Sequence, residues 1–333
     1  MIEQTIFDQY GITVDREEKG NRYPAFRSGD AIYSIIPLEE VNEAELAERQ
    51  QMSEHLALQG DRYVSRFILS KEGSYISVTE GQLFLLLENT SQEEGRSTQM
   101  GRKLAKFHHR ARSISTPIKE CSRVGEWKGL WEQRIDQLER MWNDKLVAHP
   151  NNSFEKQFIE SFPYYMSLSE NAIQYLVDTE IDDTPVMTDG GTVCYERFTN
   201  DIWSGKPCIK NPFDWVFDHG SRDIAEWTRE QYFAKPLTHQ PEITEFMNDY
   251  QALGTLSSFS ARLLYSRLLF PIHYVETIEE YFSNPKESRA NELEDKLNGY
   301  TDTAHYYEEF LKRFYEIAQV PARQLNIPSI SWL

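Results

Sequence analysis

The chain has 333 residues, of which 40% are hydrophobic and 13% aromatic. This is enough apolar material for a substantial core, so wholesale disorder is excluded, and a chain of this length is expected to form two packed lobes. Its 53 acidic and 35 basic residues give a formal net charge of −18. Because it has no basic excess with which to displace counterions, neither nucleic acid nor an anionic membrane surface is an expected partner.

No targeting segment or membrane span is visible in the sequence. The N-terminus lacks a basic region followed by an apolar stretch, which is what a signal peptide needs. The longest apolar run covers residues 83–87, far short of the ~20 residues of a membrane-spanning helix. The cysteines, Cys121, Cys194 and Cys208, are odd in number and widely spaced, as in a reducing compartment. We therefore expect a soluble protein that is made in the cytoplasm.

The first ninety residues are predicted to form short strands and one helix. Segments rich in β-branched and aromatic residues, punctuated by glycine and charged turns, predict strands at residues 5–14, 23–29, 31–38, 64–70, 74–80 and 82–89. Between the third and fourth of these, residues 39–60 are rich in Glu, Ala, Leu and Gln and predict a helix that ends at Gly60.

Beyond residue 89 the pattern changes to helical periodicity. Helices are predicted at residues 97–112, 125–143, 154–176, 256–270 and 304–318. The first places Met100, Leu104 and Phe107 on one face. The second aligns Trp127, Leu130, Trp131, Leu138 and Trp142. We interpret these apolar stripes as core packing and assign them no ligand.

Three segments carry a resemblance to protein kinases and aminoglycoside phosphotransferases. Residues 101–112 resemble the long helix with an L-A-x-x-H core, residues 191–201 the catalytic loop, and residues 211–227 the metal-binding segment with the R-D-L-A that opens the next helix. Together, over essentially the whole chain, they resemble the kinase-like endospore coat proteins of the CotS group. The resemblance implies an α+β, two-lobed protein-kinase-like fold: a small antiparallel sheet with one helix in residues 1–88, and a larger, mainly helical lobe in residues 89–333.

The catalytic loop departs from the family pattern at the residues that matter most. With Cys194 aligned on C-H-G-D, Tyr195 replaces the histidine and Arg197 replaces the catalytic aspartate. An arginine stays protonated and has no lone pair to accept a proton from a substrate hydroxyl. Ile202 stands where the metal-binding Asn is expected. A shift of one or two residues would bring Asn200 or Asp201 to that position, so both stay candidates.

The metal-binding segment is better preserved. Asp214 matches the metal-binding aspartate, and Asp218 follows four residues later. One or two carboxylates suffice for magnesium when nucleotide phosphates supply the other ligands; the alternative is that Asp214 only braces the loop. The resemblance gives Arg222 and Asp223 a structural role, with Arg222 anchoring the loop and Asp223 at the start of the next helix.

The half of the site that the N-terminal lobe should supply is missing. Before Gly60 the only glycines are Gly11, Gly20 and Gly29, too far apart for a phosphate-binding loop. The strand predicted at residues 31–38 has no basic residue, and Ile36 or a neighbour occupies the place of the lysine. Without that lysine, the carboxylates of the following helix are interpreted as a solvated acidic face; they are Glu43, Glu45 and Glu48.

Other catalytic designs find less support. His108 and His109 are adjacent on a predicted helix and point in different directions, so they make a poor metal pair. Cys194 is interpreted as a buried, inert thiol. Asp189, in M-T-D-G-G, is a second possible stand-in for the catalytic aspartate, although an ordinary turn explains that sequence better.

Two main hypotheses follow. The first is a spore coat-associated structural or binding protein with a degenerate kinase-like site, no phosphotransfer, no cofactor and no metal. The alternative is a divergent small-molecule phosphotransferase that uses ATP and magnesium through Asp214, with Asp189 or Asp201 as base. A cleft for another ligand, such as a sugar or peptide, is a third. The resemblance implies other spore coat proteins as partners, and a location in the endospore coat of a Gram-positive spore former.

Overall fold

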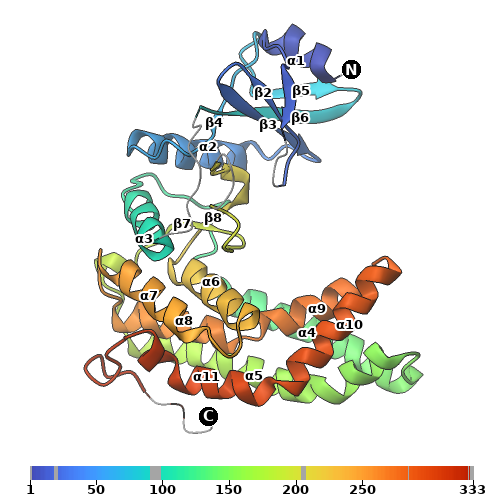
Figure 1. Ribbon diagram of the computed structural model, residues 1–333, viewed down its shortest axis with the longest axis vertical. Coiled ribbons are helices and arrows are strands. Elements are labelled where there is room, and N and C mark those ends of the chain that lie inside the picture. The colour runs from blue at the N-terminus through green and yellow to red at the C-terminus, as the bar shows by residue number, and fades with distance from the viewer. Residues whose placement is uncertain are drawn as a thin grey trace. The chain divides into compact units, whose positions relative to one another are not determined.

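The computed structural model describes residues 2–18, 22–90, 99–203, 208–283, 285–328 and 330. The chain forms two compact units, which are described separately (Figure 1). The sheet unit comprises Met1–Ser122 and Gly191–Glu230, and the helical unit comprises Arg123–Gly190 and Gln231–Leu333. The lobe boundary predicted near residue 88 falls inside the sheet unit.

The sheet unit is built on a six-stranded antiparallel sheet. Its strands pair in the order β1-β2-β3-β6-β4, and β5 also pairs with β6. Their bounds are β1 Arg16–Glu18, β2 Ala25–Ser28, β3 Ala31–Leu38, β4 Arg66–Phe67, β5 Ile76–Thr79 and β6 Gln82–Asn89. The strands predicted between residues 23 and 89 are therefore confirmed, with β4 reduced to two residues.

The strand predicted at residues 5–14 is wrong, because Ile2–Tyr10 form helix α1. Apolar residues four apart, Ile2, Ile6 and Tyr10, lie on one side of this helix. Ile6 is fully buried and packs with Phe26 and other side chains of the sheet. Helix α1 lies beside the sheet (Figure 1). The β-branched composition suggested a strand, but the spacing of four and burial against the sheet determine the structure.

Helix α2, Glu43–Leu58, confirms the helix predicted at residues 39–60. The side chain of Asn42 accepts hydrogen bonds from the amides of the first turn and fixes its start. Helix α3, Met100–Ala111, likewise buries the predicted stripe of Met100, Leu104 and Phe107. In the described part of residues 1–88 there are thus two helices, α1 and α2, whereas one is predicted.

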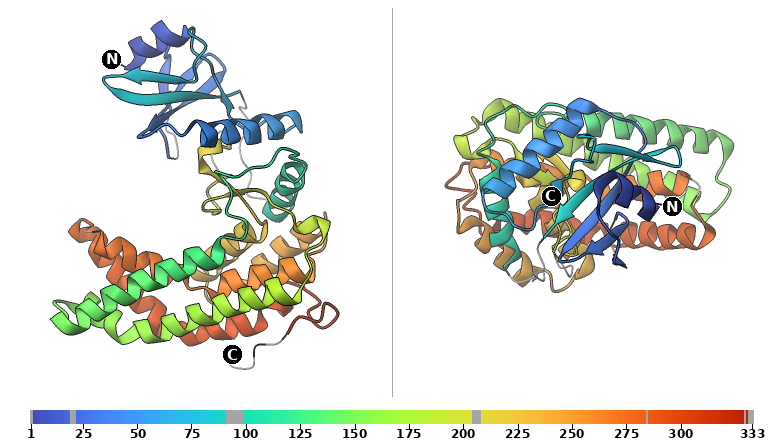
Figure 2. Two further views of the ribbon diagram at one scale, coloured as in Figure 1. Left: turned by 180° about the vertical axis from the view of Figure 1, so that it is seen from behind. Right: turned by 90° about the horizontal axis from the view of Figure 1, so that it is seen from above.

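The helical unit contains two long helices, α4 Trp127–Ala148 and α5 Ser153–Asp182, which run along one another (Figure 2). Its other helices are α7 Gln240–Gln251, α8 Ser258–Leu269, α9 Ile272–Phe282, α10 Glu287–Asp302 and α11 Ala304–Ile317. The predicted fold class, a sheet-containing N-terminal part followed by a larger helical part, is confirmed. Among the described residues, no helix is both long and apolar enough to span a membrane.

One detail of the predicted stripe on α4 is wrong. Trp127, Trp131 and Leu138 are buried, whereas Leu130 is 39% exposed. At 100° per residue, Leu130 lies about 95° from the centre of the buried stripe. Ile135 occupies the buried position instead.

Candidate functional site

The candidate site lies in the sheet unit, around a two-stranded hairpin. Strand β7, Thr192–Tyr195, pairs antiparallel with β8, Trp215–Asp218. Beyond the last pair, the amide of Glu196 donates to the carbonyl oxygen of Asp214 at 2.9 Å. The segment with the predicted catalytic loop and the segment with the predicted metal ligand are therefore side by side.

Tyr195, at the position of the family's histidine, is a core residue. Its side chain is buried, and its hydroxyl accepts a hydrogen bond from Nε1 of Trp203 at 2.8 Å. Its ring also contacts those of Phe107, Phe198 and Trp215. Burial raises the pKa of the hydroxyl well above its usual value. A neutral phenol enclosed by aromatic rings is suited to packing and unsuited to proton transfer.

Arg197, at the position of the catalytic aspartate, is directed to helix α6, Ser221–Ala234. Its Nη1 lies 3.3 Å from Oε2 of Glu226, and the other carboxylate oxygen of Glu226 lies 3.5 Å from Nη1 of Arg229. The arginine side chain is 44% exposed, whereas that of Glu226 is only 10% exposed. Arg197 therefore neutralises a mostly buried carboxylate.

Asn200 is bound to the same helix one turn further along. Its amide donates to the carboxylate of Glu230 at 2.7 Å, and its side-chain oxygen accepts from Nε1 of Trp227 at 2.7 Å. Asp201 lies on the exposed surface, and Ile202 is half-buried. The loop after β7 is thus attached to α6 through several side chains of that helix.

Asp214 faces a positive charge from the protein itself. Its Oδ1 lies 3.2 Å from Nη1 of Arg22, and a carboxylate oxygen of Glu196 lies 3.5 Å from the same nitrogen. Burial raises the pKa of Asp214, and the charge and hydrogen bond of Arg22 partly offset this increase. Two carboxylates from neighbouring strand ends therefore share one guanidinium group.

Asp218 and Arg222 form an internal anchor beneath the loop. Asp218 is fully buried and accepts from Nη1 of Arg222 at 2.9 Å and from the amide of His219 at 2.7 Å. Arg222 also donates to the carbonyl oxygens of Tyr195 and Glu196, at 3.1 and 3.2 Å. The acceptors of Asp218 are thus engaged within the protein, and Arg222 fixes the path of the backbone after β7.

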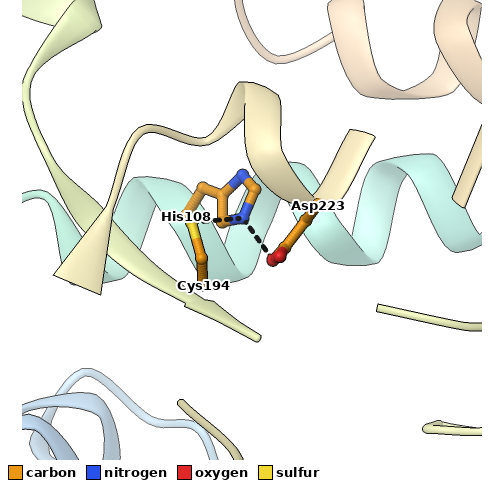
Figure 3. A group of neighbouring side chains, drawn as sticks. All are labelled: His108, Cys194 and Asp223. Atoms are coloured by element: carbon orange, nitrogen blue, oxygen red, sulfur yellow. Dashed lines mark hydrogen bonds and ion pairs between the residues drawn. The ribbon is translucent and has the colours of Figure 1, made fainter. Parts of the chain in front are cut away.

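Asp223, His108 and Cys194 form a fully buried cluster that joins α6, α3 and β7 (Figure 3). One oxygen of Asp223 accepts the amide of Tyr195 at 3.0 Å, and the other lies 3.0 Å from Nε2 of His108. The sulfur of Cys194 lies 3.9 Å from the same nitrogen. Burial lowers the pKa of His108 and raises those of Asp223 and Cys194.

This cluster could in principle hold a metal ion, because its nitrogen, sulfur and oxygen atoms lie within 4.8 Å of one another. Zinc accepts such donors. However, His108 and Asp223 already bond to each other, and the thiol lies 3.6 and 3.5 Å from the carbonyl oxygens of Asp218 and His219. The hydrogen bonds are satisfied without an ion, so the cluster is a structural anchor.

Sequence analysis predicts a structural role for Asp223 but does not connect it to His108, although that histidine stands in the L-A-x-x-H segment. His108 is fully buried and His109 is exposed, so the prediction that the two point in different directions is confirmed. The predicted burial of Cys194 is confirmed as well. Only the fold reveals that His108 faces Asp223, 115 residues away.

On the N-terminal side of the site, strand β3 lacks the phosphate-binding lysine of the family pattern. Ile36 in β3 is 1% exposed and packs with Leu85 and Leu87 in the core. Among the glycines, Gly29 lies in the turn between β2 and β3, and Gly20 lies outside the described residues. Strand β3 therefore presents no cation for a phosphate group.

The interpretation of the α2 carboxylates as a solvated face is wrong for Glu48. Glu45 pairs with Arg49 of its own helix at 2.7 Å. Glu48 accepts the amides of Lys119 and Cys121, at 2.7 and 2.9 Å. Glu43 is exposed, and the side chain of Glu45 is 40% exposed. The two bonds of Glu48 join α2 to a later segment of the chain, which the local sequence pattern does not reveal.

Asp189 lies in the helical unit, in a short turn of 3₁₀ helix, Met187–Asp189. Its buried carboxylate accepts the amide of Val186 at 2.8 Å and the hydroxyl groups of Ser257 and Ser260. These bonds fit the interpretation as an ordinary turn, with the aspartate bracing the start of α8.

Comparisons with known proteins place the chain in a family. Residues 3–314 match the model of the family described as "Spore coat putative kinase YutH". The chain belongs to this YutH family. It is 41% identical over 338 residues to the endospore coat-associated protein YutH of Bacillus subtilis (strain 168), with 100% of this chain and 98% of the relative covered. The resemblance to kinase-like spore coat proteins is thereby confirmed.

Solved structures confirm the kinase-like fold of this YutH-family chain. An aminoglycoside phosphotransferase from Alicyclobacillus acidocaldarius aligns with a TM-score of 0.70 and 15% identity, covering 96% of this chain and 97% of that one. A microcompartment-associated aminopropanol kinase aligns with a TM-score of 0.60 and 12% identity, covering 95% and 98%. At such low identity these likenesses establish the fold alone.

Proposed function

We propose that this chain is a spore coat-associated binding protein whose kinase-like site performs no phosphotransfer. The observation that carries the proposal is the pairing of Asp214, the one preserved metal-ligand position, with Arg22 at 3.2 Å. The coat association of the relative from Bacillus subtilis supports the location, and other coat proteins are the corresponding partners.

Electrostatics argues against a metal ion at Asp214. Phosphoryl transfer depends on magnesium to neutralise the phosphate oxygens. Here Arg22 lies within 3.5 Å of both Asp214 and Glu196, so a divalent cation would have to displace a guanidinium group or suffer its repulsion. The protein's own charge supplies the compensation that a metal would otherwise give.

The catalytic loop supports the same proposal. A base must accept the proton of a substrate hydroxyl, and Arg197 has no acceptor. Its side chain pairs with Glu226, and Asn200 is bound to Trp227 and Glu230. These contacts give the loop a structural task in place of the catalytic one.

A titration with magnesium and ATP, followed by thermal unfolding, tests the proposal. Any ligand that binds the native state must stabilise it, by about 2.7 kcal/mol at a hundredfold excess over its Kd. We expect millimolar magnesium-ATP to leave the melting temperature unchanged. An Arg22→Met variant, which keeps a long side chain but removes the charge, tests whether Arg22 is what prevents a magnesium ion from binding at Asp214. If the native chain binds magnesium-ATP and Asp214→Ala abolishes that binding, the proposal is overturned.

That last outcome would support the second candidate, a divergent phosphotransferase that uses Asp214 for magnesium. Two observations favour it: the acidic residue is retained, and the structural neighbours are phosphotransferases. In this case the candidate base is Asp201, which lies in the segment after β7 and is exposed. Loss of turnover in Asp201→Asn, with nucleotide binding retained, would assign that role.

A further inference from the structure

The end of β3 and the start of α2 enclose a pocket of about 260 Å³ in the sheet unit, and nothing above assigns it a role. Its apolar wall includes Leu38, Leu46 and Phe213. These three side chains pack against the buried core residues Ile36, Leu85 and Leu87. Because the wall is continuous with the core, the pocket is a preformed feature of the fold.

Two carboxylates at the rim of this pocket are uncompensated. Glu39 and Glu40 are exposed, and neither has a hydrogen bond or ion pair among the described residues. By contrast, the third acidic side chain of the lining, Glu45, pairs with Arg49 at 2.7 Å.

Neither of the positive groups near the pocket offsets the two rim carboxylates. Arg49 is only 10% exposed and also donates to the carbonyl oxygens of Pro212 and Trp215, at 2.8 and 3.1 Å. The positive end of α2 already faces Asn42 as its cap and Glu43 and Glu45 in its first turn. The mouth of the pocket therefore carries a net negative charge above an apolar wall.

We propose that this pocket receives an arginine side chain from a basic segment of a partner protein. Its volume is below the ~300–1,000 Å³ of pockets for drug-sized ligands, so it suits a single long side chain. The methylene stem of an arginine would lie along Leu38 and Leu46, because Arg49 already stacks on the ring of Phe213, and its guanidinium would reach Glu39 and Glu40. An apolar residue beside the arginine would cover Val41, which is 41% exposed at the pocket.

A protein segment is the occupant that fits this chain as a whole. The net charge of −18 attracts cationic partners and speeds their encounter. The choice of a protein over a small cation rests on the binding role proposed above. The pocket itself is defined by residues other than Arg197 and Asp214, which carry the argument about phosphotransfer.

Fluorescence polarisation with a labelled, end-blocked Gly-Leu-Arg-Leu-Gly peptide tests the proposal on the full chain at low salt. The same peptide with citrulline in place of arginine keeps the shape and removes the charge. We expect the arginine peptide to bind at least about tenfold more tightly than the citrulline peptide. Raising the salt should weaken its binding.

Two variants locate the binding, and one controls for net charge. Glu39→Gln with Glu40→Gln removes the rim charges, and Val41→Trp fills the pocket without changing charge; each should weaken binding at least about tenfold. The control, Asp295→Asn with Glu309→Gln, makes the same change in net charge at exposed positions of α10 and α11 and should bind as the native chain does.

Any one of four results would overturn the proposal. The arginine peptide does not bind the native chain, the citrulline peptide binds equally well, or binding is unchanged in the Glu39→Gln/Glu40→Gln variant or in Val41→Trp. None of them bears on nucleotide binding at Asp214. Conversely, magnesium-ATP binding would overturn the proposed function while leaving the peptide result intact, so the two failures are distinguishable.

Discussion

At the scale of single residues, the replacements in the kinase-like site have acquired partners of their own. Arg197 neutralises Glu226, Tyr195 fills an aromatic core, and Arg22 neutralises Asp214. Restoring one family residue would therefore disturb a local interaction without recreating the remaining machinery. The site is a connected structure, so single reversions are informative about stability more than about activity.

Arg197→Asp illustrates this at the catalytic position. The variant loses the ion pair to Glu226 and adds a like charge beside it, but the arginine is 44% exposed. We expect a loss of about 0.5–1 kcal/mol in unfolding free energy, measured by urea denaturation, and no gain of ATP turnover. Arg197→Gln, which removes the pair without the added repulsion, should be milder. Measurable phosphotransfer by Arg197→Asp would contradict this view of the site.

The cysteine thiols offer a second prediction at this scale. Burial raises the pKa of all three, that of Cys121 to about 12. At pH 8 such a thiol has a thiolate fraction about a thousandfold below that of a free cysteine, and the thiolate is the reactive form. We expect iodoacetamide to leave the folded chain unlabelled and to modify all three sites after unfolding, as read by mass spectrometry. Rapid labelling of Cys194 in the folded protein would refute its inert, buried state.

At the scale of secondary structure, the buried contact between His108 and Asp223 holds α3, β7 and α6 together. Its members are far apart in sequence, and each forms part of a different element. Such a contact depends on the fold being complete, and it contributes stability to all three elements at once.

Removal of the Asp223 carboxylate should therefore be costly. Asp223→Ala leaves the amide of Tyr195 without its buried acceptor and the imidazole of His108 without its buried hydrogen-bond partner, and we expect a loss of about 2–4 kcal/mol in unfolding free energy. Asp223→Asn keeps one acceptor oxygen and should lose less. Urea denaturation measures both; equal stability of Asp223→Ala and the native chain would exclude this anchor.

Helix α1 provides a test of the N-terminal structure. Ile6 is fully buried against the sheet, whereas the adjacent Phe7 is 50% exposed. Ile6→Ala should cost about 2–4 kcal/mol in unfolding free energy because it leaves a cavity. Phe7→Ala, the matched control on the same helix, should change it by only about 0.5 kcal/mol. Similar losses for both variants would be inconsistent with the helix and its buried face.

Sequence patterns predicted the elements whose signals are local. The β-branched and aromatic residues of β3, the Glu-, Ala-, Leu- and Gln-rich composition of α2 and the apolar stripe of α3 are each set by residues close in the chain. By contrast, the strand prediction for residues 5–14 is wrong. The β-branched composition of this segment favours a strand, whereas Ile2, Ile6 and Tyr10 lie four residues apart and pack on the sheet as one face of α1. The contacts of Arg22 with Asp214 and of His108 with Asp223 span 192 and 115 residues, and no local pattern encodes them.

At the scale of the whole molecule, the chain has the kinase-like fold of its family, and the proposed absence of phosphotransfer rests on the arrangement of its charges. Family membership establishes the architecture, and the fold alone does not decide activity. The protein is acidic and has two units. Its sheet unit holds a preformed pocket at the end of β3 and a loop after β7 whose side chains pair with α6. This combination favours binding as the function that persists.

The most direct test of this account is ATP turnover by the purified chain with magnesium. Active protein kinases turn over at about 1–100 per second, so even a strongly impaired site would be detected over hours. We predict a rate equal to that of buffer, and the same rate for Arg22→Met, because Arg197 and Ile36 stand where the base and the phosphate-binding lysine are expected. Turnover above the background that disappears in Asp214→Asn would contradict the central claim and identify the chain as an enzyme.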